Sequence, residues 1–392
     1  MSSAAILAIN AGSSSLKFAL FAHSAALERV AAGEVSGLGT VPRLRAQRTD
    51  GMPQQQDLQG APTAADALRA AMDWLGTQCA EFHFAAIGHR VVHGGTRFHA
   101  PVVTDEKVLG ELEELDPLAP QHQPFNLAGI RELRRRFPHA LAVACFDTAF
   151  HAGWNDATAR LAIPRRFHDA GVRRYGFHGL SYEFLNARLR HELPRASRTV
   201  FAHLGSGASL CAVRDGRSID CTMGFSVLDG LPMSTRSGAI DPGVIFHLQR
   251  QHRMTFEQVE HLLYYDSGLK GVSGISSDMR TLLANAAPAA REAIALFVQH
   301  CIREIGAMVA VLGGIDGLVF SGGIGAQAAP VRAAICAQLE FLGVVLDASR
   351  NAAGDACISA ESARVPVLAW PTDEEHVIAR HCATFLSNPA AN

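Results

Sequence analysis

Residues 6–21 read ILAINAGSSSLKFALF, an apolar run followed by a turn of small residues and then an alternating stretch. After the turn, Leu16, Phe18 and Leu20 fall on one face and the residues between them on the other. This period of two predicts a strand, where a P-loop or a dinucleotide-binding unit would open a helix. The stretch is therefore expected to form a β-hairpin with residues 10–15 at its tip.

A second stretch has the same design. Residues 199–213 read TVFAHLGSGASLCAV, again an apolar run, a glycine and serine turn, and an alternating run. Such a tip presents bare backbone N–H groups and hydroxyls, which suit close approach to phosphate oxygens. One tip of this kind means little, because turns are rich in glycine and serine. Two of them, half the chain apart, predict a duplicated domain that holds phosphates between its halves.

Length and composition set the broad class of the protein. The chain has 392 residues, which exceeds the ~250–300 at which a single core stops growing, so two domains are expected. It is 48% hydrophobic and only 18% charged, which favours a large core and a buried subunit interface. The net charge of −2 gives no electrostatic case for binding nucleic acid or a membrane surface.

The cysteines and the apolar segments indicate a cytoplasmic protein. The eight cysteines show no CxxC spacing, and Cys145, Cys211 and Cys301 sit inside apolar segments, as buried free thiols do in a reducing compartment. The N-terminus has neither a basic region nor a long apolar run, so no signal peptide is expected. The longest apolar run, residues 305–315, is too short to span a bilayer.

Two charged residues lie at the ends of predicted strands in the first half. Arg90 falls inside or at the end of a strand in AAIGHRVVHGGTRF, residues 85–98. It is either a surface arginine or a guanidinium fork aimed at a carboxylate or phosphate. Asp147 directly follows the buried strand at residues 140–146, which suits a ligand-site carboxylate or a helix N-cap.

Other candidates sit in irregular segments. His122 lies between prolines and could cap a helix at residues 126–136. His178 sits in a glycine turn, where a histidine is often just exposed. Arg236 lies in the long loop of residues 224–247, and loops of this length are usually functional or mobile.

The last third of the chain contains recognisable helix ends. Ser276 or Ser277 is expected to cap a helix that starts near residue 278. A strand at residues 317–320 leads through SGGIG into a helix reaching residue 339, a geometry that cradles anions. Before the closing helix, Thr372 and Glu375 have capping-box spacing, which leaves Glu374 free to face a site.

Together these segments resemble one known family. NAGSSSLKF, GHRVVHGG, FDTAFH, RRYGFHG, HLGSGAS, TRSGAIDPG, GGIG and PTDEE occur in the order and spacing of the acetokinase family of short-chain acyl kinases. The resemblance runs from the first strand to the last helix. It implies a duplicated α/β fold of the actin/hexokinase/Hsp70 type (ASKHA, RNase H-like), with two domains around a central cleft. One lobe would comprise residues 1–149 and 375–392, and a nucleotide-binding and dimerisation lobe would comprise residues 150–374.

The resemblance also implies a reaction. Acetate and ATP would give acetyl phosphate and ADP reversibly, by direct in-line displacement, in a homodimer that uses Mg²⁺ or Mn²⁺. Position by position, Arg90 would bind the substrate carboxylate, and Asp147 matches the residue usually described as the acid or base. His178 and Arg236 would stabilise the transition state.

The remaining roles follow from the same resemblance. Asn10 and Glu374 would hold the metal. The acyl pocket would be lined by Val92, His122, Phe177, Gln121 and Val227. The nucleotide would contact Lys17, His203, Leu204, Gly205, Ser206, Gly207, Asp278, Met279, Arg280, Gly323, Ile324, Gly325, Ala326 and Gln327.

The residue types fit phosphoryl transfer to a carboxylate. The nucleophile is ionised at pH 7, so no general base is required. The site needs cations that bring two anions together, which arginine, lysine, histidine and Mg²⁺ supply. We therefore expect Asp147 to act chiefly by orienting an arginine or a magnesium-bound water.

The chain departs from the family pattern at several positions. Ser206 and Ala239 replace the usual asparagine and aspartate, Ala326-Gln327 replace Glu-Asn, and Leu180-Ser181-Tyr182 replace Thr-Ser-His. In the acyl pocket Gln121 replaces leucine and Val227 replaces proline, so the acyl chain length stays open. A polar amide on a methyl-binding wall would leave its hydrogen bonds unmade.

Three alternatives to acetate kinase activity stay open. A propionate or other short-chain acyl kinase would use the same chemistry. A kinase for a hydroxyl group would need a true base and a polar pocket, whereas Val92, Phe177 and Val227 suggest an apolar one. A nucleotide-gated binding module needs no carboxylate clamp, and the presence of both Arg90 and Arg236 argues against it.

Overall fold

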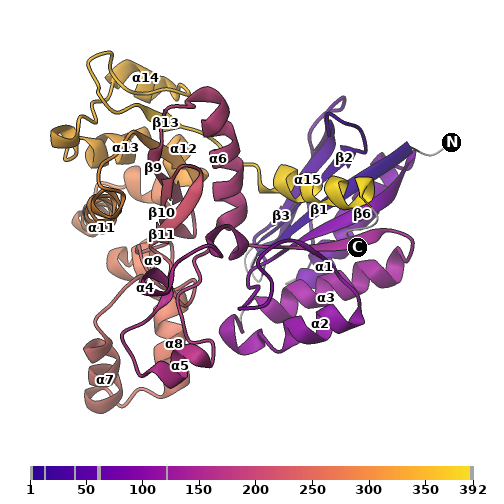
Figure 1. Cartoon of the computed structure of the whole chain (residues 1–392), viewed down its shortest axis with the longest axis horizontal. Coiled ribbons are helices and arrows are strands. Elements are labelled where there is room, and N and C mark those ends of the chain that lie inside the picture. Colours follow the sequence, from indigo (N-terminus) through magenta and orange to yellow (C-terminus); the bar gives the residue numbers. More distant parts are fainter. Residues whose placement is uncertain (1–2, 13–14, 39–40, 60–62, 121, 389–392) are drawn as a thin grey trace. The chain divides into compact units, whose positions relative to one another are not determined.

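The chain folds into two compact α/β units, each built on one sheet. The structure is a computed structural model that describes residues 3–12, 15–38, 41–59, 63–120 and 122–388. The first unit comprises Met1–Ala149 and Asp373–Asn392, and the second comprises Phe150–Thr372. The C-terminal helix thus belongs to the N-terminal unit (Figure 1).

The first unit contains an eight-stranded sheet of order β5-β4-β3-β2-β1-β6-β8-β7. Strands β1 (Ser3–Ala11) and β2 (Ser15–Ala22) form the first predicted hairpin, with Asn10 opposite Lys17. Strands β6 (Phe82–Val91) and β8 (Leu141–Phe146) run parallel to β1, so their carboxyl ends meet at one edge. The other strands are β3 (Arg29–Ser36), β4 (Arg43–Arg48), β5 (Gln54–Asp57) and β7 (Val102–Val103).

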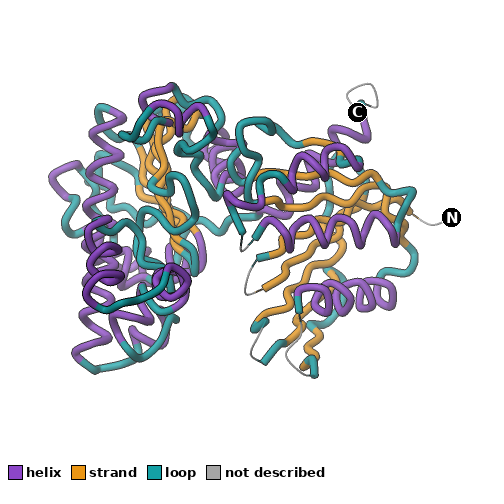
Figure 2. The backbone as a smooth tube through the Cα atoms, turned by 90° about the horizontal axis from the view of Figure 1, so that it is seen from below, coloured by secondary structure: helices purple, strands orange, loops and turns teal. Residues whose placement is uncertain are grey.

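Helices cover both faces of this sheet (Figure 2). Helices α1 (Ala64–Gln78) and α3 (Gln123–Arg136) bury Leu75 and Leu133 in one apolar cluster with β1 and β2, and α2 (Glu106–Glu113) packs on α3. Helix α15 (Glu374–Ser387) packs on β1, β6 and β8. It approaches closely because β6 has a glycine beneath it: a Cβ on Gly88 would lie 2.3 Å from Ile378 and 2.6 Å from Cys382.

The second unit repeats the central part of this plan. Its sheet has the order β11-β10-β9-β12-β13. Strands β9 (Arg198–Leu204) and β10 (Ala208–Arg214) form the second predicted hairpin, and β11 (Arg217–Cys221) adds to it antiparallel. Strands β12 (Gly317–Ser321) and β13 (Val367–Ala369) continue in parallel beside β9. The same succession surrounds β1: on one side two strands joined by successive antiparallel pairings, on the other two strands joined by successive parallel pairings. The predicted duplication is therefore confirmed.

Helices surround the second sheet, with α6 and α11 on opposite sides of it (Figure 1). The helices are α4 (Asp156–Ala159), α5 (Arg165–Asp169), α6 (Gly179–Glu192), α7 (Pro242–Gln251), α8 (Phe256–Tyr265), α9 (Gly268–Ser273), α10 (Met279–Leu283), α11 (Pro288–Leu312), α12 (Gly322–Gln327), α13 (Ala329–Cys336) and α14 (Ala348–Ala353).

Helix α11 is the one described helix with the length and apolar composition to cross a membrane. It ends at Gly313, whose φ of 70° gives the left-handed cap that glycine favours. Its buried stripe, which includes Phe297, Cys301 and Ile305, packs among β10, α9 and α13. This is the packing of a core helix within its unit.

Several helix ends differ from the predictions. The single helix expected after the SGGIG loop and reaching residue 339 is wrong. Helix α12 already begins inside that segment, at Gly322, and α13 follows as a separate helix, because Pro330 at the start of α13 has no N–H to continue α12. The buried Arg332 side chain closes the break by donating to the carbonyls of Gly325 (3.0 Å) and Ala326 (2.8 Å). Helix α10 is capped by Asp278 and not by Ser276 or Ser277.

The cysteines are free thiols, as predicted. All eight are free thiols, and seven of them are buried, Cys145, Cys211 and Cys301 included.

The close packing of α15 on β6 predicts the effect of a minimal substitution. Gly88→Ala should lower the free energy of unfolding by ~1–3 kcal/mol, because the added methyl overlaps Ile378 and Cys382. Gly76→Ala in α1 is the control, since a Cβ there meets nothing within 4 Å, and it should stabilise by up to ~1 kcal/mol. Urea unfolding measures both, and equal stability of the Gly88 variant and the wild type would refute the packing argument.

Candidate functional site

An ion pair joins the ends of two parallel strands in the first unit. In the β6–β8 register Arg90 lies opposite Cys145, two residues before Asp147. The guanidinium is held in a fork: Nε lies 3.0 Å from both carboxylate oxygens of Asp147, and Nη2 lies 2.6 Å from Oδ2. The Asp147 side chain is 1% exposed and that of Arg90 is 15% exposed, so the pair is nearly dry. One edge of the guanidinium is thus fixed by the protein.

A second cluster adjoins this pair through Asn10 at the end of β1. The Asn10 side-chain amide donates to Oε2 of Glu374 and to Oε1 of Glu375, each at 2.9 Å. Its carbonyl oxygen accepts from Nη1 of Arg90 at 3.3 Å. The carboxyl ends of β1, β6 and β8 and the first turn of α15 therefore form one hydrogen-bonded group.

The expected capping box at the start of α15 is wrong. Asp373 is the N-cap, and its carboxylate accepts from the backbone N–H of His376 at 3.0 Å. Glu375 consequently has no capping task and joins Glu374 at Asn10. Glu375 was not predicted as a site residue. Helix α15 begins one residue later than the capping box assumed, so Asp373 is the N-cap and Glu375 contacts Asn10 instead.

The electrostatics of this group favour a bound cation. The pKa of Glu374 is raised to about 7, chiefly by burial; Arg90 and Lys17 oppose the rise, and Asp147 and Glu375 add to it. Burial lowers the pKa of Arg90, but Asp147 more than offsets this, so the guanidinium stays charged. Three carboxylates thus lie near one buried guanidinium, and adding positive charge would stabilise the deprotonated form of Glu374.

The donor set fits Mg²⁺ or Mn²⁺. Carboxylate and amide oxygens are the ligands that these ions prefer, and Mg²⁺ commonly uses one or two carboxylates together with waters and substrate phosphates. Among the described residues no group of three His, Cys, Asp or Glu side chains is placed to hold a metal by itself. The oxygens of Asn10 and Glu374 therefore suit an ion that a nucleotide phosphate helps to hold.

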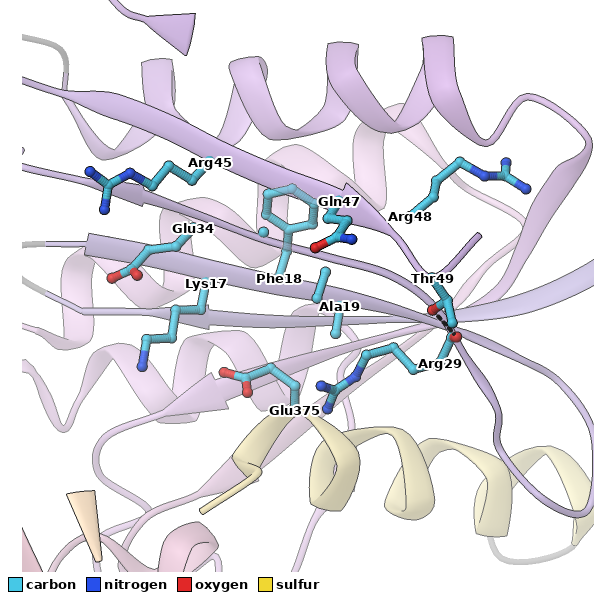
Figure 3. A pocket seen from close by; sticks show the side chains of 12 residues that line it. Lys17, Phe18, Ala19, Arg29, Glu34, Arg45, Gln47, Arg48, Thr49 and Glu375 are labelled. Carbon is cyan, nitrogen blue, oxygen red and sulfur yellow. Dashed lines mark hydrogen bonds between the residues drawn. The ribbon is translucent and has the colours of Figure 1, made fainter. Parts of the chain in front are cut away.

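Lys17 lies on the sheet face next to this group and lines a pocket of about 530 Å³. In the strand register it stands opposite Asn10 on one side and Glu34 on the other. Figure 3 shows Lys17, Glu34 and Arg45 on neighbouring strands, with Glu375 at the start of α15 beside them. The ammonium group is exposed, as a group that meets a ligand from solution would be.

The acyl-pocket residues of the first unit are partly described. Val92 is fully buried, and its N–H donates to Oδ1 of Asn126 at 3.2 Å. Asn126 also donates to the carbonyl of Ala11 at 3.1 Å, so it ties the hairpin tip to the strand that carries Arg90. His122 is the N-cap residue of α3, which begins three residues earlier than predicted. Gln121 lies outside the described residues.

In the second unit the tip of the β9–β10 hairpin is surrounded by cationic and imidazole nitrogens. A Cβ on Gly207 would lie 2.9 Å from Nη2 of Arg236 and 3.2 Å from Nε2 of His178. A Cβ on Gly205 would lie 3.7 Å from Nε2 of His203 and 3.8 Å from the backbone nitrogen of Gly323. The glycines leave open the space onto which these groups converge, and that space would suit a phosphate.

Hydrogen bonds fix the side chains around this tip. Nη1 of Arg236 donates to the carbonyl of Val227 at 2.6 Å, so this backbone oxygen orients the guanidinium. The rings of His178 and His203 stack at 4.4 Å, and Nδ1 of His203 lies 2.8 Å from Oγ of Ser181. His178 has a φ of 58°, an unfavourable left-handed backbone that recurs at functional sites.

The other residues predicted to bind the nucleotide lie in several elements of the second unit and differ in burial. Residues 323–327 lie in α12, directly after β12, which pairs with β9. Leu204 is buried, and Ser206 is exposed at the hairpin tip. Asp278 accepts from the backbone and side chain of Arg280 at the start of α10, and Met279 is buried. Phe177 is buried, with its carbonyl 2.9 Å from Nε2 of His151.

Comparison with known proteins agrees with these features. The sequence model of the acetokinase family matches residues 5–380. The acetate kinase of Methylocella silvestris is 46% identical over 98% of this chain and 99% of its own length. That of Rhizobium meliloti is 48% identical over 99% of this chain and 100% of its own length.

Solved structures give the same picture. A propionate kinase from Francisella tularensis superposes with a TM-score of 0.89 at 32% identity, over 96% of this chain and 98% of its own. The acetate kinase of Porphyromonas gingivalis superposes with a TM-score of 0.86 at 33% identity, over 98% and 100%.

The Asn10 cluster makes a prediction about charge and pH. Asn10→Asp replaces an amide that donates to both glutamates with a carboxylate that repels them, and it should lower the free energy of unfolding by ~1–3 kcal/mol at pH 8. The loss should shrink at pH 6, because Glu374, with its pKa raised to about 7, is then protonated and shares its proton.

Urea unfolding at the two pH values in metal-free buffer measures this difference. Asn155→Asp is the matched control, since Asn155 caps α4 and aspartate caps a helix equally well. A destabilisation of the Asn10 variant that does not depend on pH would contradict the electrostatic explanation.

Proposed function

The chain belongs to the acetokinase family, and on this premise we propose that it transfers the γ-phosphoryl group of ATP to the carboxylate of acetate, giving acetyl phosphate and ADP. The observation that carries the proposal is the Arg90 guanidinium, fixed along one edge by Asp147 beside a group of oxygen ligands suited to Mg²⁺. A fork held in this way recognises a second carboxylate, which here would be the acetate anion.

The reaction makes one bond and breaks one. A carboxylate oxygen of acetate attacks the γ-phosphorus of ATP, the bond from that phosphorus to the β–γ bridging oxygen breaks, and ADP leaves with the electron pair. Acetate is already ionised, so no proton has to be removed from the nucleophile. Catalysis then consists of positioning and of neutralising charge.

In the first unit Arg90 would hold the acetate and Asp147 would hold Arg90. Asp147 uses both oxygens on the guanidinium, which is the task of an orienting group. Asn10 and Glu374 would hold the metal, with Glu375 fixing the Asn10 amide and Lys17 meeting the nucleotide phosphates. When bound, the ion would neutralise charge on the phosphate oxygens.

In the second unit the hairpin tip would hold the transferred group. Gly205 and Gly207 would let phosphate oxygens approach the backbone closely. His178 and Arg236 would donate to the oxygens that gain charge in the transition state, and an arginine in such a position can contribute ~10³-fold to the rate. Residues 323–327 and 278–280, with His203, would bind the rest of the nucleotide.

Acetate is the substrate we favour, and propionate is the alternative. The acetate kinases named above are 46–48% identical to this chain, whereas the Francisella propionate kinase is 32% identical but superposes well. In the first unit the buried Val92 would contribute to the apolar wall around the methyl group. One methylene changes binding in such a pocket by only ~1–3 kcal/mol, so the two acids differ by a modest factor.

We further propose a cytoplasmic homodimer formed through the second unit. Seven buried free thiols suit a reducing compartment. Large apolar side chains of the second unit are exposed on successive helices and their ends: Val244, Phe246, Phe256, Tyr265, Val272, Ile275, Leu283 and Val311. An exposed set of this kind commonly marks a protein interface.

An acyl phosphate assay tests the function. With ATP and Mg²⁺, hydroxylamine trapping should detect acyl phosphate from acetate, and propionate should have a lower kcat/KM by about 5- to 100-fold. Glycerol and glucose are the controls, because a kinase for hydroxyl groups would phosphorylate them instead. Slow ATP hydrolysis that no acid accelerates would indicate a binding module and refute the proposal.

The orienting role of Asp147 has its own test. Asp147→Asn should raise the KM for acetate by about tenfold, because the fork on Arg90 is lost, while the pH profile of kcat stays unchanged. Excess Mg²⁺ should restore part of the turnover. The control Asp316→Asn breaks a similar pair with Arg198 away from the site and should leave kcat within about twofold of wild type. A displaced pH profile without rescue by Mg²⁺ would instead identify Asp147 as a proton-transfer group.

A further inference from the structure

A chain of two buried hydroxyls ends on the ring of His178. The phenol oxygen of Tyr182 lies 2.5 Å from Oγ of Ser209, and Oγ of Ser209 lies 2.8 Å from Nδ1 of His178. Tyr182 and Ser209 are both fully buried. Among the residues that the structure describes, neither hydroxyl has a further side-chain hydrogen bond, and the phenol oxygen also accepts from the backbone N–H of His203.

Counting protons along this chain distinguishes the two forms of the histidine. The three atoms make two hydrogen bonds, and each hydroxyl contributes one proton. If Nδ1 of His178 carries no proton, Tyr182 donates to Ser209 and Ser209 donates to Nδ1, so both protons are used. If Nδ1 carries a proton, three protons compete for two bonds, and one buried hydroxyl proton has no side-chain acceptor. Burying such a donor unsatisfied is unfavourable.

We propose that Tyr182 is a positioning residue that acts through Ser209 to hold His178 as the neutral tautomer with its proton on Nε2. The proposal rests on the proposed function, in which His178 donates to the transferred phosphoryl group. It adds that the donor is an uncharged N–H, fixed in identity and direction by a hydroxyl chain behind the ring.

The surroundings of His178 support a neutral ring. Its Nε2 faces Gly207 together with Nη2 of Arg236, and this permanent positive charge disfavours a second one beside it. On its other side the ring stacks on that of His203, whose Nδ1 bonds to Ser181. Burial raises the pKa of Tyr182 well above its usual value, so the phenol keeps the proton that it donates.

The arrangement separates two tasks at the hairpin tip. Arg236 supplies charge, and His178 supplies a directed hydrogen bond that does not depend on its protonation. A neutral histidine with its proton on Nδ1 would present a lone pair to the phosphate oxygens and repel them.

The tautomer can be measured directly in the intact enzyme. Nitrogen NMR of isotope-labelled histidine, with the His178 signals assigned by their loss in His178→Gln, should show Nε2 protonated and Nδ1 unprotonated from pH 6 to 8. In Tyr182→Phe, Ser209 can accept a proton from Nδ1, so the pKa of His178 should rise and both tautomers should appear. The value of kcat should fall by about three- to tenfold and depend on pH in that range, with the KM for acetate and ATP unchanged.

Two further variants keep the test decisive. Tyr175→Phe is the matched control: it removes another buried phenol, bonded to the Gly171 carbonyl at 2.5 Å, and should alter neither the NMR signals nor the pH profile. Ser209→Ala breaks the chain in the middle, and adding Tyr182→Phe to it should cause no further loss. If Tyr182→Phe does not fold, the wild-type spectrum still shows which nitrogen of His178 carries the proton. Ser209→Ala then tests whether the hydroxyl chain determines it.

The two proposals fail in different ways. A proton on Nδ1 in the wild-type enzyme, or unchanged spectra and pH profile in Tyr182→Phe, would overturn the positioning role even if acyl phosphate is made. Absence of acyl phosphate with the expected tautomer present would overturn the proposed function and leave the hydroxyl chain standing.

Discussion

The buried pair of Arg90 and Asp147 is the interaction on which the candidate site of the first unit depends. The Arg90 guanidinium can be buried because both oxygens of the Asp147 carboxylate accept its hydrogen bonds. Removing one member of such a pair typically lowers the free energy of unfolding by ~3–5 kcal/mol. The same pair ties β6 to β8, and the contact of Arg90 with Asn10 extends the link to β1. The group proposed to bind the acetate anion is thus also part of the scaffold, and its direction is fixed by Asp147.

Duplication gives each unit a hairpin with a tip of small residues, but the two units place opposite charge around it. In the first unit, carboxylates outnumber the buried guanidinium, as the raised pKa of Glu374 indicates. In the second, an arginine and two imidazoles face the tip and no carboxylate is among the groups nearest to Gly205 and Gly207. The group around Asn10 and Arg90 in the first unit suits a cation together with a carboxylate. The group around Gly205 and Gly207 in the second unit suits phosphate oxygens. The fold was repeated, and the side chains around it diverged in chemistry.

Much of this could be predicted from the sequence. In both stretches an apolar run, a turn of small residues and a period-two alternation after the turn identified the hairpin, because strand geometry is a local property. The sequence placed Arg90 and Asp147 each at the end of a predicted strand, and the parallel register of β6 and β8 is what brings the two together. The capping error at Glu375 has a physical cause: Thr372 and Asp373 are both good caps, and the contact of the next turn with Asn10, 365 residues away, decides between them. Ser209 and Tyr182 could not be found, since a proton chain exists only in three dimensions.

The two donors proposed for the transferred group, Arg236 and His178, are held by different means. Arg236 is oriented by a backbone carbonyl, which has no proton to lose, so its geometry does not change with pH. A histidine can turn from donor to acceptor at the same atom, and its ring must therefore be fixed in protonation as well as in direction. A hydroxyl chain achieves both, because its proton count balances for one tautomer only. The charge of Arg236 does not depend on its neighbours, whereas a neutral His178 donor requires Ser209 and Tyr182 to fix its tautomer.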